Sequence, residues 1–245
     1  MILLTGPTRT GKSTAIKKIV GMLGIKNCGG FCTEEIREND ERVGFRIKTL
    51  SGKTGILAHI NINSEKRISE YGVDMRFFKE FCISELQEAI DNDDVKYIII
   101  DEVGPMQVLS MEYRELLIKL LKSEKIVIGT IFLNPSEWLD DFKKMDGLEL
   151  VNVSLENRNE IPLQMVERLA MNDETLKRKI EKAKRYCTER ERFRVFDNYV
   201  EVRGDHGIRI VKKENNNYTC NCDFYMEHGT CSHIIATINL NLIKE

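Results

Sequence analysis

Residues 6–13 read Gly6-Pro7-Thr8-Arg9-Thr10-Gly11-Lys12-Ser13, and this stretch decides the fold because it completes the pattern G-x-x-x-x-G-K-[ST]. A glycine-bounded loop between a strand and a helix aims backbone N–H groups and the positive end of a helix dipole at a polyphosphate. The Lys12 ammonium then neutralises the β and γ phosphates, and the Ser13 hydroxyl coordinates the Mg²⁺ carried by the nucleotide. The residues predicted to bind a nucleoside triphosphate such as ATP or GTP are Gly6, Pro7, Thr8, Arg9, Thr10, Gly11, Lys12, Ser13, Thr14 and Asp101.

The sequence on both sides of the loop fits this prediction. Residues 2–4 are apolar and predict a short buried strand. Residues 13–23 carry apolar side chains at helical spacing, and Gly24 supplies a helix stop. A chance match of the pattern would not bring its own strand and helix.

The composition limits the kinds of protein that this chain can be. With 245 residues, 42% of them hydrophobic and 31% charged, the chain can form one substantial core and a small accessory module. No run approaches the eighteen or so apolar residues that span a bilayer, and the N-terminus does not read as a secretory leader. We therefore expect a cytoplasmic protein with no membrane partner.

Residues 28–57 predict a β-rich insertion close to the loop. Apolar and polar side chains alternate over residues 42–50, which predicts a half-buried strand paired with residues 28–37 as a β-hairpin. A turn at residues 51–53 leads to a further short strand that ends near Leu57. Apolar residues at roughly helical spacing over 75–90 predict a helix.

Residues 97–102 form an apolar run that ends in two carboxylates, Asp101 and Glu102. Such a run suits a strand buried on both faces of a parallel sheet, with its C-terminal end at the nucleotide. In phosphate-loop enzymes the aspartate holds Mg²⁺ through water, and a following glutamate orients or deprotonates the attacking water. The sequence assigns these roles to Asp101 and Glu102.

Strands and helices continue to alternate beyond this point. The pattern predicts helices over 111–121 and 161–169, and strands over 125–131 and 150–154. This alternation indicates an α/β fold, a P-loop NTPase domain over residues 1–170 with a parallel sheet covered by helices and a β-hairpin insertion.

This region resembles the small nucleoside triphosphatases first described from thermophiles, a family with a human cancer-related member. The motifs that carry the resemblance are residues 6–14, 30–35, 42–45, 57–58, 71–74, 100–106 and 156–158. The resemblance implies Mg²⁺-dependent hydrolysis of nucleoside triphosphates to diphosphate and phosphate with broad base selectivity. It gives phosphate and metal binding to Lys12 and Ser13, contact with the metal through water to Asp101, water activation to Glu102 and charge stabilisation near the γ phosphate to Arg158.

Two residues depart from the family pattern. Arg9 stands where family loops commonly carry a further glycine, at a position suited to positive φ. Gln107 stands where the family usually has glutamate. Both departures bear on the rate of hydrolysis more than on nucleotide binding.

The C-terminal part carries a second site. Three of the seven cysteines fall within residues 220–231, and Cys220, Cys222, Cys231 and His233 form a C-x-C-x(8)-C-x-H array. Three thiolates and one imidazole complete a tetrahedral Zn²⁺ site. With a strand over 208–212 and an apolar helix over 234–238, they predict a small ββα zinc-binding module over 194–245. His206 and His228 are predicted to be surface residues outside the ligand set.

The array resembles the SWIM-type zinc finger, a resemblance that implies binding of DNA or protein. Residues 177–213 hold thirteen Lys or Arg against six Asp or Glu, an excess that suits a phosphate backbone but is equally typical of a solvated helix face. Residues 171–193 are predicted to be a charged helical linker.

Three functions stay open at this point. The first is a nucleoside triphosphatase that carries a zinc-stabilised binding module. The second is a nucleotide-gated DNA- or protein-binding adaptor with slow hydrolysis, which Arg9 and Gln107 keep open. The third is a nucleotide kinase, against which stands the absence of an arginine-rich lid segment.

Overall fold

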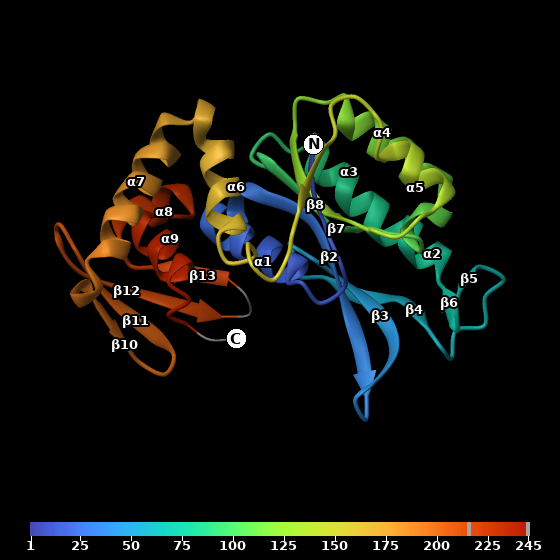
Figure 1. The fold of residues 1–245 in the computed structure, drawn as a ribbon, viewed down its shortest axis with the longest axis horizontal. Coiled ribbons are helices and arrows are strands. Elements are labelled where there is room, and N and C mark those ends of the chain that lie inside the picture. Colours follow the sequence, from blue (N-terminus) through green and yellow to red (C-terminus); the bar gives the residue numbers. More distant parts are fainter. Residues whose placement is uncertain (215–216, 244–245) are drawn as a thin grey trace. The chain divides into compact units, whose positions relative to one another are not determined.

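The computed structural model describes residues 1–214 and 217–243, which form two compact units (Figure 1). The first unit consists of Met1–Ser13 and Cys28–Ser154. The second consists of Thr14–Asn27 and Leu155–Glu245. Helix α1 (Lys12–Leu23) therefore begins in the first unit and continues in the second.

The first unit is built on one sheet in the order β5-β6-β4-β3-β2-β7-β8-β1-β9. Its strands are β1 (Ile2–Thr5), β2 (Cys28–Glu38), β3 (Glu41–Thr49), β4 (Thr54–His59), β5 (Arg67–Ile68), β6 (Tyr71–Val73), β7 (Tyr97–Val103), β8 (Ile126–Ile131) and β9 (Glu149–Asn152).

One half of this sheet is parallel and the other is antiparallel. Strands β2, β7, β8, β1 and β9 pair in parallel, as the alternation of strands and helices predicts. The β2–β3 hairpin and strands β4 to β6 extend the same sheet with antiparallel pairs. The predicted α/β fold is thus confirmed, and the hairpin proves to be part of the main sheet.

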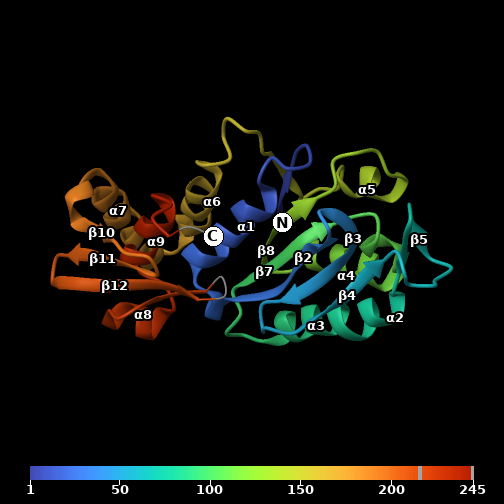
Figure 2. The ribbon, with the colours of Figure 1, turned by 90° about the horizontal axis from the view of Figure 1, so that it is seen from below.

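Helices cover one face of the sheet in the first unit (Figure 2). These elements are α2 (Met75–Phe77), a π-helical turn (Phe78–Ile83), α3 (Ser84–Asp91), a 3₁₀ turn (Gln107–Leu109), α4 (Met111–Leu121) and α5 (Glu137–Phe142). The helix predicted over 75–90 is therefore one helical run whose middle turn is widened.

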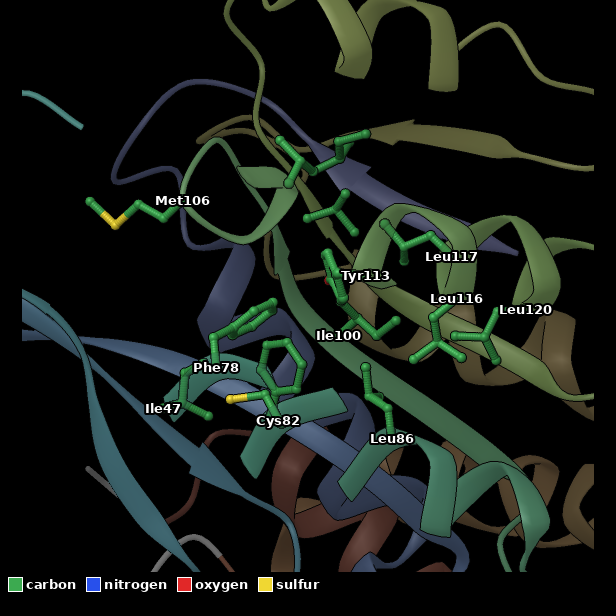
Figure 3. Close-up of a cluster of buried hydrophobic side chains, with 14 of the residues drawn as sticks. Ile47, Phe78, Cys82, Leu86, Ile100, Met106, Tyr113, Leu116, Leu117 and Leu120 are labelled. Atoms are coloured by element: carbon green, nitrogen blue, oxygen red, sulfur yellow. The ribbon is translucent and has the colours of Figure 1, made fainter. Parts of the chain in front are cut away.

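The core lies between this helical layer and the sheet (Figure 3). Helix α4 buries Tyr113, Leu116, Leu117 and Leu120, which lie on one face because three and four residues complete about one helical turn. Phe78 packs edge-on against Tyr113, with ring centroids 5.1 Å apart. Strand β7 lies between β2 and β8, and its apolar run is buried. Its polar residues at the C-terminal end are therefore the ones available for a functional site.

The second unit combines α1 with the C-terminal residues. Its other helical elements are a 3₁₀ turn (Ile25–Asn27), α6 (Ile161–Leu169), a 3₁₀ turn (Ala170–Asn172), α7 (Glu174–Thr188), a 3₁₀ turn (Arg190–Arg192), α8 (Asp223–His228) and α9 (Ser232–Asn239). An antiparallel sheet holds β10 (Phe193–Val195), β11 (Tyr199–Gly204), β12 (Gly207–Glu214) and β13 (Asn217–Cys220). Across residues 1–214 and 217–243, no helix combines the length and apolar character that a bilayer span requires.

Helix α9 forms the centre of the C-terminal module. Its apolar residues Ile234, Ile235 and Ile238 are buried, and it contacts α7 and strands β11 to β13. Helix α7 faces it with buried Leu176 and Ile180. The sequence predicted one strand here, over 208–212, and missed strands β10, β11 and β13 and helix α8 because these segments are short and rich in polar residues.

Candidate active site and metal centre

The phosphate loop curls around the ammonium group of Lys12. Lys12 Nζ donates hydrogen bonds of 2.8 Å to the carbonyl oxygens of both Gly6 and Pro7. The Thr10 hydroxyl donates to Pro7 O at 2.9 Å. Gly6 has φ +141°, and a Cβ at this position would lie 2.3 Å from Val153 O, so only glycine fits. The Lys12 and Thr10 side chains therefore hold the loop together from within.

Arg9 occupies the strained position of this loop. Its φ is +65°, in the left-handed region that disfavours side chains bearing a Cβ. The side chain is exposed, as are those of Pro7, Thr8, Ser13 and Thr14. The sequence expectation of positive φ at this departure from the family pattern is confirmed.

Strand β7 presents its two carboxylates beside Lys12. Asp101 is 3% exposed, and its Oδ1 accepts a hydrogen bond from the Thr130 hydroxyl on the neighbouring strand β8. Burial lowers the pKa of Lys12, and the negative charges of Glu102 and Asp101 oppose this shift. The structure thus brings together three of the predicted site residues in the first unit.

Glu102 has an unusual acidity. Its pKa is raised to about 7: burial and, to a smaller extent, the charge of Asp101 raise it, and the Lys12 ammonium opposes them. A carboxylate with a pKa close to neutrality can accept a proton and release it again under ordinary conditions. Glu102 is therefore a carboxyl group that can change its protonation state near neutral pH.

Gln107, the second departure from the family pattern, lines the same end of β7. It is 3% exposed, and its Nε2 donates to the Thr33 hydroxyl on β2 at 3.3 Å. Gly104 lies between Gln107 and Glu102, because a Cβ on Gly104 would lie 3.0 Å from both Gln107 Oε1 and Glu102 Cγ. Gln107 therefore adds a neutral amide, and no charge, to the surroundings of Glu102.

Sequence reasoning gave no role to Thr33 and Thr130. Each lies on a strand next to β7, in the registers Cys32↔Asp101 and Ile100↔Gly129. The sequence marks Thr130 only as a hydroxyl within the apolar run of β8. The strand order that brings it to Asp101 cannot be predicted from the sequence.

Arg158 lies in the second unit, in the turn before α6, and its side chain is exposed. Thr14 also belongs to this unit and follows Ser13 in the first turn of α1. The role that the family resemblance gives to Arg158 stays a prediction.

The hard oxygen ligands that Mg²⁺ prefers are present in the first unit. The Ser13 hydroxyl is exposed at the start of α1, and Asp101 is a buried carboxylate at the end of β7. A hydroxyl, a carboxylate and substrate phosphates form a donor set that suits Mg²⁺, which usually keeps several waters.

The second cluster is formed by Cys220, Cys222, Cys231 and His233. All four are buried, and their ligand atoms lie within 4.8 Å of one another. His233 Nδ1 lies 3.8 Å from Cys220 Sγ and 3.6 Å from Cys231 Sγ. Tetrahedral Zn–S bonds of about 2.3 Å place neighbouring ligand atoms roughly 3.5–3.8 Å apart. The donor set and spacing therefore fit Zn²⁺.

The local fold explains this convergence. Cys220 ends β13, while Cys222 and Cys231 precede the first residues of α8 and α9. The Cys222 thiol has a lowered pKa because Cys220 and Cys231 donate to it, whereas burial raises the pKa of Cys231.

Two residues that the sequence did not single out lie against His233. The ring of Tyr186, from α7, stacks on the imidazole with centroids 5.8 Å apart. A Cβ on Gly204 would lie 2.7 Å from His233 Nε2. His206 and His228 are exposed and lie outside the cluster, as predicted.

Comparison with known proteins identifies the first two thirds of the chain. The family model described as NTPase matches residues 1–166. The chain belongs to this NTPase family. Nucleoside-triphosphatase THEP1 of Thermotoga maritima is 37% identical to it over 171 residues, which make up 70% of this chain and 96% of the relative. The cancer-related nucleoside-triphosphatase homolog of Mus musculus is 30% identical, over 65% of this chain and 91% of that one.

Solved structures agree with this assignment. The crystal structure of THEP1 from Aquifex aeolicus matches this NTPase-family chain with a TM-score of 0.62 at 34% identity, over 69% of this chain and 99% of that one. The solution structure of a human cancer-related nucleoside triphosphatase matches with a TM-score of 0.56 at 27% identity. The family match ends at residue 166, and the Cys/His cluster lies beyond it.

Proposed function

We propose that this NTPase-family enzyme hydrolyses nucleoside triphosphates, ATP and GTP among them, to diphosphate and phosphate with Mg²⁺ and broad base selectivity. One observation carries the proposal: Lys12, Asp101 and Glu102 share one electrostatic environment at the end of β7, where Glu102 has a pKa of about 7. Support also comes from the relatives, which are named nucleoside-triphosphatases.

The phosphate loop would bind the substrate. Backbone N–H groups of residues 6–14 and the start of α1 would surround the phosphates. Lys12 now donates to two loop carbonyls at 2.8 Å, so it would exchange these bonds for bonds to phosphate oxygens. Ser13 and Asp101 would hold Mg²⁺, which when bound neutralises charge on the β and γ phosphates.

Glu102 would activate the attacking water. In its ionised form it accepts a proton as the water oxygen approaches the γ phosphorus, and it loses that proton after the phosphate leaves. Arg158 would stabilise negative charge near the γ phosphate. Lys12 and Glu102 act directly on the reacting groups and are the proposed catalytic residues, with Arg158 as the third.

The C-terminal module would bind Zn²⁺ through Cys220, Cys222, Cys231 and His233, as a SWIM-type finger that recognises nucleic acid or protein. Support comes from the spacing of the four ligand atoms, all within 4.8 Å. When bound, the ion supplies no reaction; it crosslinks β13 to the starts of α8 and α9 and so stabilises the module.

We divide the chain into the NTPase domain (1–170), a helical linker (171–193) that contains α7, and the finger (194–245). The absence of a helix suited to a membrane among the described residues is compatible with a cytoplasmic location, which we also propose.

The experiment is steady-state phosphate release from ATP, GTP, CTP and UTP with Mg²⁺, in the absence of any acceptor, for the wild type and Lys12→Ala. Release from all four substrates by the wild type alone supports the proposal. Tight triphosphate binding with negligible phosphate release would favour the nucleotide-gated adaptor. The positive φ of Arg9 and the neutral Gln107 are the observations that support this alternative. Transfer to an added nucleotide in place of release would identify a kinase.

A further inference from the structure

The C-terminal end of helix α1 is completed by residues from the other end of the chain. The last carbonyl groups of any α-helix lack donors within the helix. In α1, Val20 O accepts from Gly24 N at 2.9 Å, and Leu23 O accepts from Asn27 Nδ2 at 2.8 Å. Met22 O instead accepts a buried hydrogen bond of 2.6 Å from the hydroxyl of Thr230. A residue 208 positions away therefore caps this helix.

The same segment touches α1 closely elsewhere. Asn27 Nδ2 also donates to His228 O at 3.0 Å. Gly24 has φ +85°, and a Cβ there would lie 2.5 Å from Gly229 O. Residues 228–230 therefore lie against the backbone of the helix end, at a distance that no side chain on residue 24 could allow.

The preceding turn of α1 is equally close to the module. A Cβ on Gly21 would lie 2.8 Å from Ile238 Cδ1 in α9 and 3.0 Å from the Tyr218 ring in β13. Met22 and Leu23 are buried as well. The C-terminal half of α1 thus packs against the helix and the strand that carry metal-ligand residues (Figure 1).

The capping residue directly precedes a metal-ligand residue. Thr230 is followed by Cys231, so an ion held by the four clustered side chains restrains the loop that carries the capping hydroxyl. The opposite end of α1 begins with Lys12 and Ser13 of the phosphate loop. One helix therefore has the nucleotide-binding residues at its first turn and the metal-binding loop at its last.

We propose that Thr230 is a positioning residue for nucleotide binding: it fixes the C-terminal end of α1 from the metal-binding loop and so links Zn²⁺ binding to triphosphate binding. The inference rests on the proposed function, since it requires both ligands to bind. Linkage is reciprocal, so Zn²⁺ strengthens nucleotide binding by the same factor by which nucleotide strengthens Zn²⁺ binding. Couplings between sites typically amount to about five- to 150-fold.

The test is the dissociation constant of a non-hydrolysable ATP analogue with Mg²⁺, measured by calorimetry on the full chain loaded with Zn²⁺ and after removal of the metal with a chelator. The coupling factor is the ratio of the two constants. For the wild type we expect a factor of about five to a hundred. Circular dichroism on the same samples reports whether the protein stays folded after metal removal.

Matched variants separate the cap from general stability. Thr230→Val removes the hydroxyl at nearly constant volume, and we expect its coupling factor to fall toward one while Zn²⁺ still binds. Thr230→Ser keeps the hydroxyl and restores the factor. Thr237→Val is the control, because Thr237 is fully buried in α9 and its hydroxyl has no hydrogen-bond partner among the described residues; it keeps the wild-type factor.

Two results would overturn the inference. If the wild type binds the analogue equally well with and without Zn²⁺, the two sites are not coupled. This result would contradict the coupling but not the proposed nucleotide and Zn²⁺ sites themselves. A Thr230→Val protein with the wild-type factor shows that the cap does not carry the coupling. Failure to take up Zn²⁺, or failure to bind the analogue in either metal state, would instead contradict the proposed function itself, and the coupling with it.

Discussion

The hydroxyl of Thr130 donates a buried hydrogen bond to Asp101 Oδ1 across two adjacent parallel strands. Asp101 is 3% exposed, so its carboxylate cannot be held in place by bulk water. Hydrogen bonds to charged groups contribute about 1.5–3 kcal/mol. Thr130 therefore fixes the carboxylate that we propose to hold the nucleotide's metal ion through water.

We predict that Thr130→Val raises the Mg²⁺ concentration needed for half-maximal hydrolysis and lowers kcat/KM by about ten- to a hundredfold, since a charge-assisted hydrogen bond is lost. Thr130→Ser retains the donor and should behave like the wild type. Titration of phosphate release against Mg²⁺ makes the comparison. Equal Mg²⁺ dependence of the valine and serine variants would argue against a positioning role.

The raised pKa of Glu102 leads to a prediction about how the rate of hydrolysis depends on pH. Its pKa is raised to about 7 by burial and by Asp101, and a general base works only when ionised. The kcat/KM for hydrolysis should therefore be low at pH 5.5 and rise with pH through a midpoint of about 7. A pH-rate profile measures the midpoint. A flat profile between pH 5.5 and 8 would remove Glu102 as the base.

The same shift predicts an effect on stability. A carboxyl group whose pKa is higher in the folded state than its unfolded value of about 4.3 favours the fold below that value, and this contribution is lost as pH rises through about 7. Glu102→Gln, which cannot ionise, should therefore stabilise the protein by about 1–3 kcal/mol at pH 8 and by little at pH 4. Urea denaturation at both pH values provides the comparison, and equal effects at the two would contradict it.

The backbone conformation of Arg9 leads to a prediction about the stability of the protein. Its φ of +65° disfavours any residue with a Cβ, by about 1–2 kcal/mol relative to glycine. Arg9→Gly should be more stable than Arg9→Ala by about 1 kcal/mol once the extra freedom of glycine in the unfolded chain is counted. Thermal unfolding of the two variants gives the difference, and an alanine variant as stable as the glycine variant would show that the loop relaxes.

The contact of Tyr186 with His233 leads to a prediction about the Zn²⁺ affinity of the metal centre. Its ring stacks on His233 from α7, so it restrains the imidazole whose Nδ1 faces the thiols. Tyr186→Phe keeps the ring and should keep the Zn²⁺ affinity, whereas Tyr186→Leu should lower it by about tenfold or more, as loss of outer contacts to metal ligands does. Competition with a chromophoric chelator measures both. Equal affinities of the two variants would exclude a role for the stack.

Much of the first unit could be predicted from the sequence because its signals are local. The phosphate loop fixes its own turn through Gly6 and Gly11, both at positive φ, and the run of β7 is long enough to identify a buried strand. Helix α1 begins within one residue of its predicted start and ends at Leu23 before a left-handed Gly24.

The remainder depends on contacts between distant residues. Nothing local in the sequence relates Thr130 to Asp101, or Gln107 to Thr33, because strand order and register decide these neighbours. The sheet of the C-terminal module was largely missed because β10 and β11 are short and mix charged residues, such as Arg194 and Arg203, with their apolar ones. The ligand spacing, by contrast, was local enough to predict the cluster.

The most direct test of the central claim compares Glu102→Gln with the wild type in two assays, ATP-analogue affinity with Mg²⁺ and single-turnover hydrolysis of ATP. The account predicts that the variant binds the analogue at least as well as the wild type, because the change removes a negative charge beside the phosphates, while hydrolysis falls by about 10²-fold or more. Hydrolysis at the wild-type rate in Glu102→Gln would contradict the account.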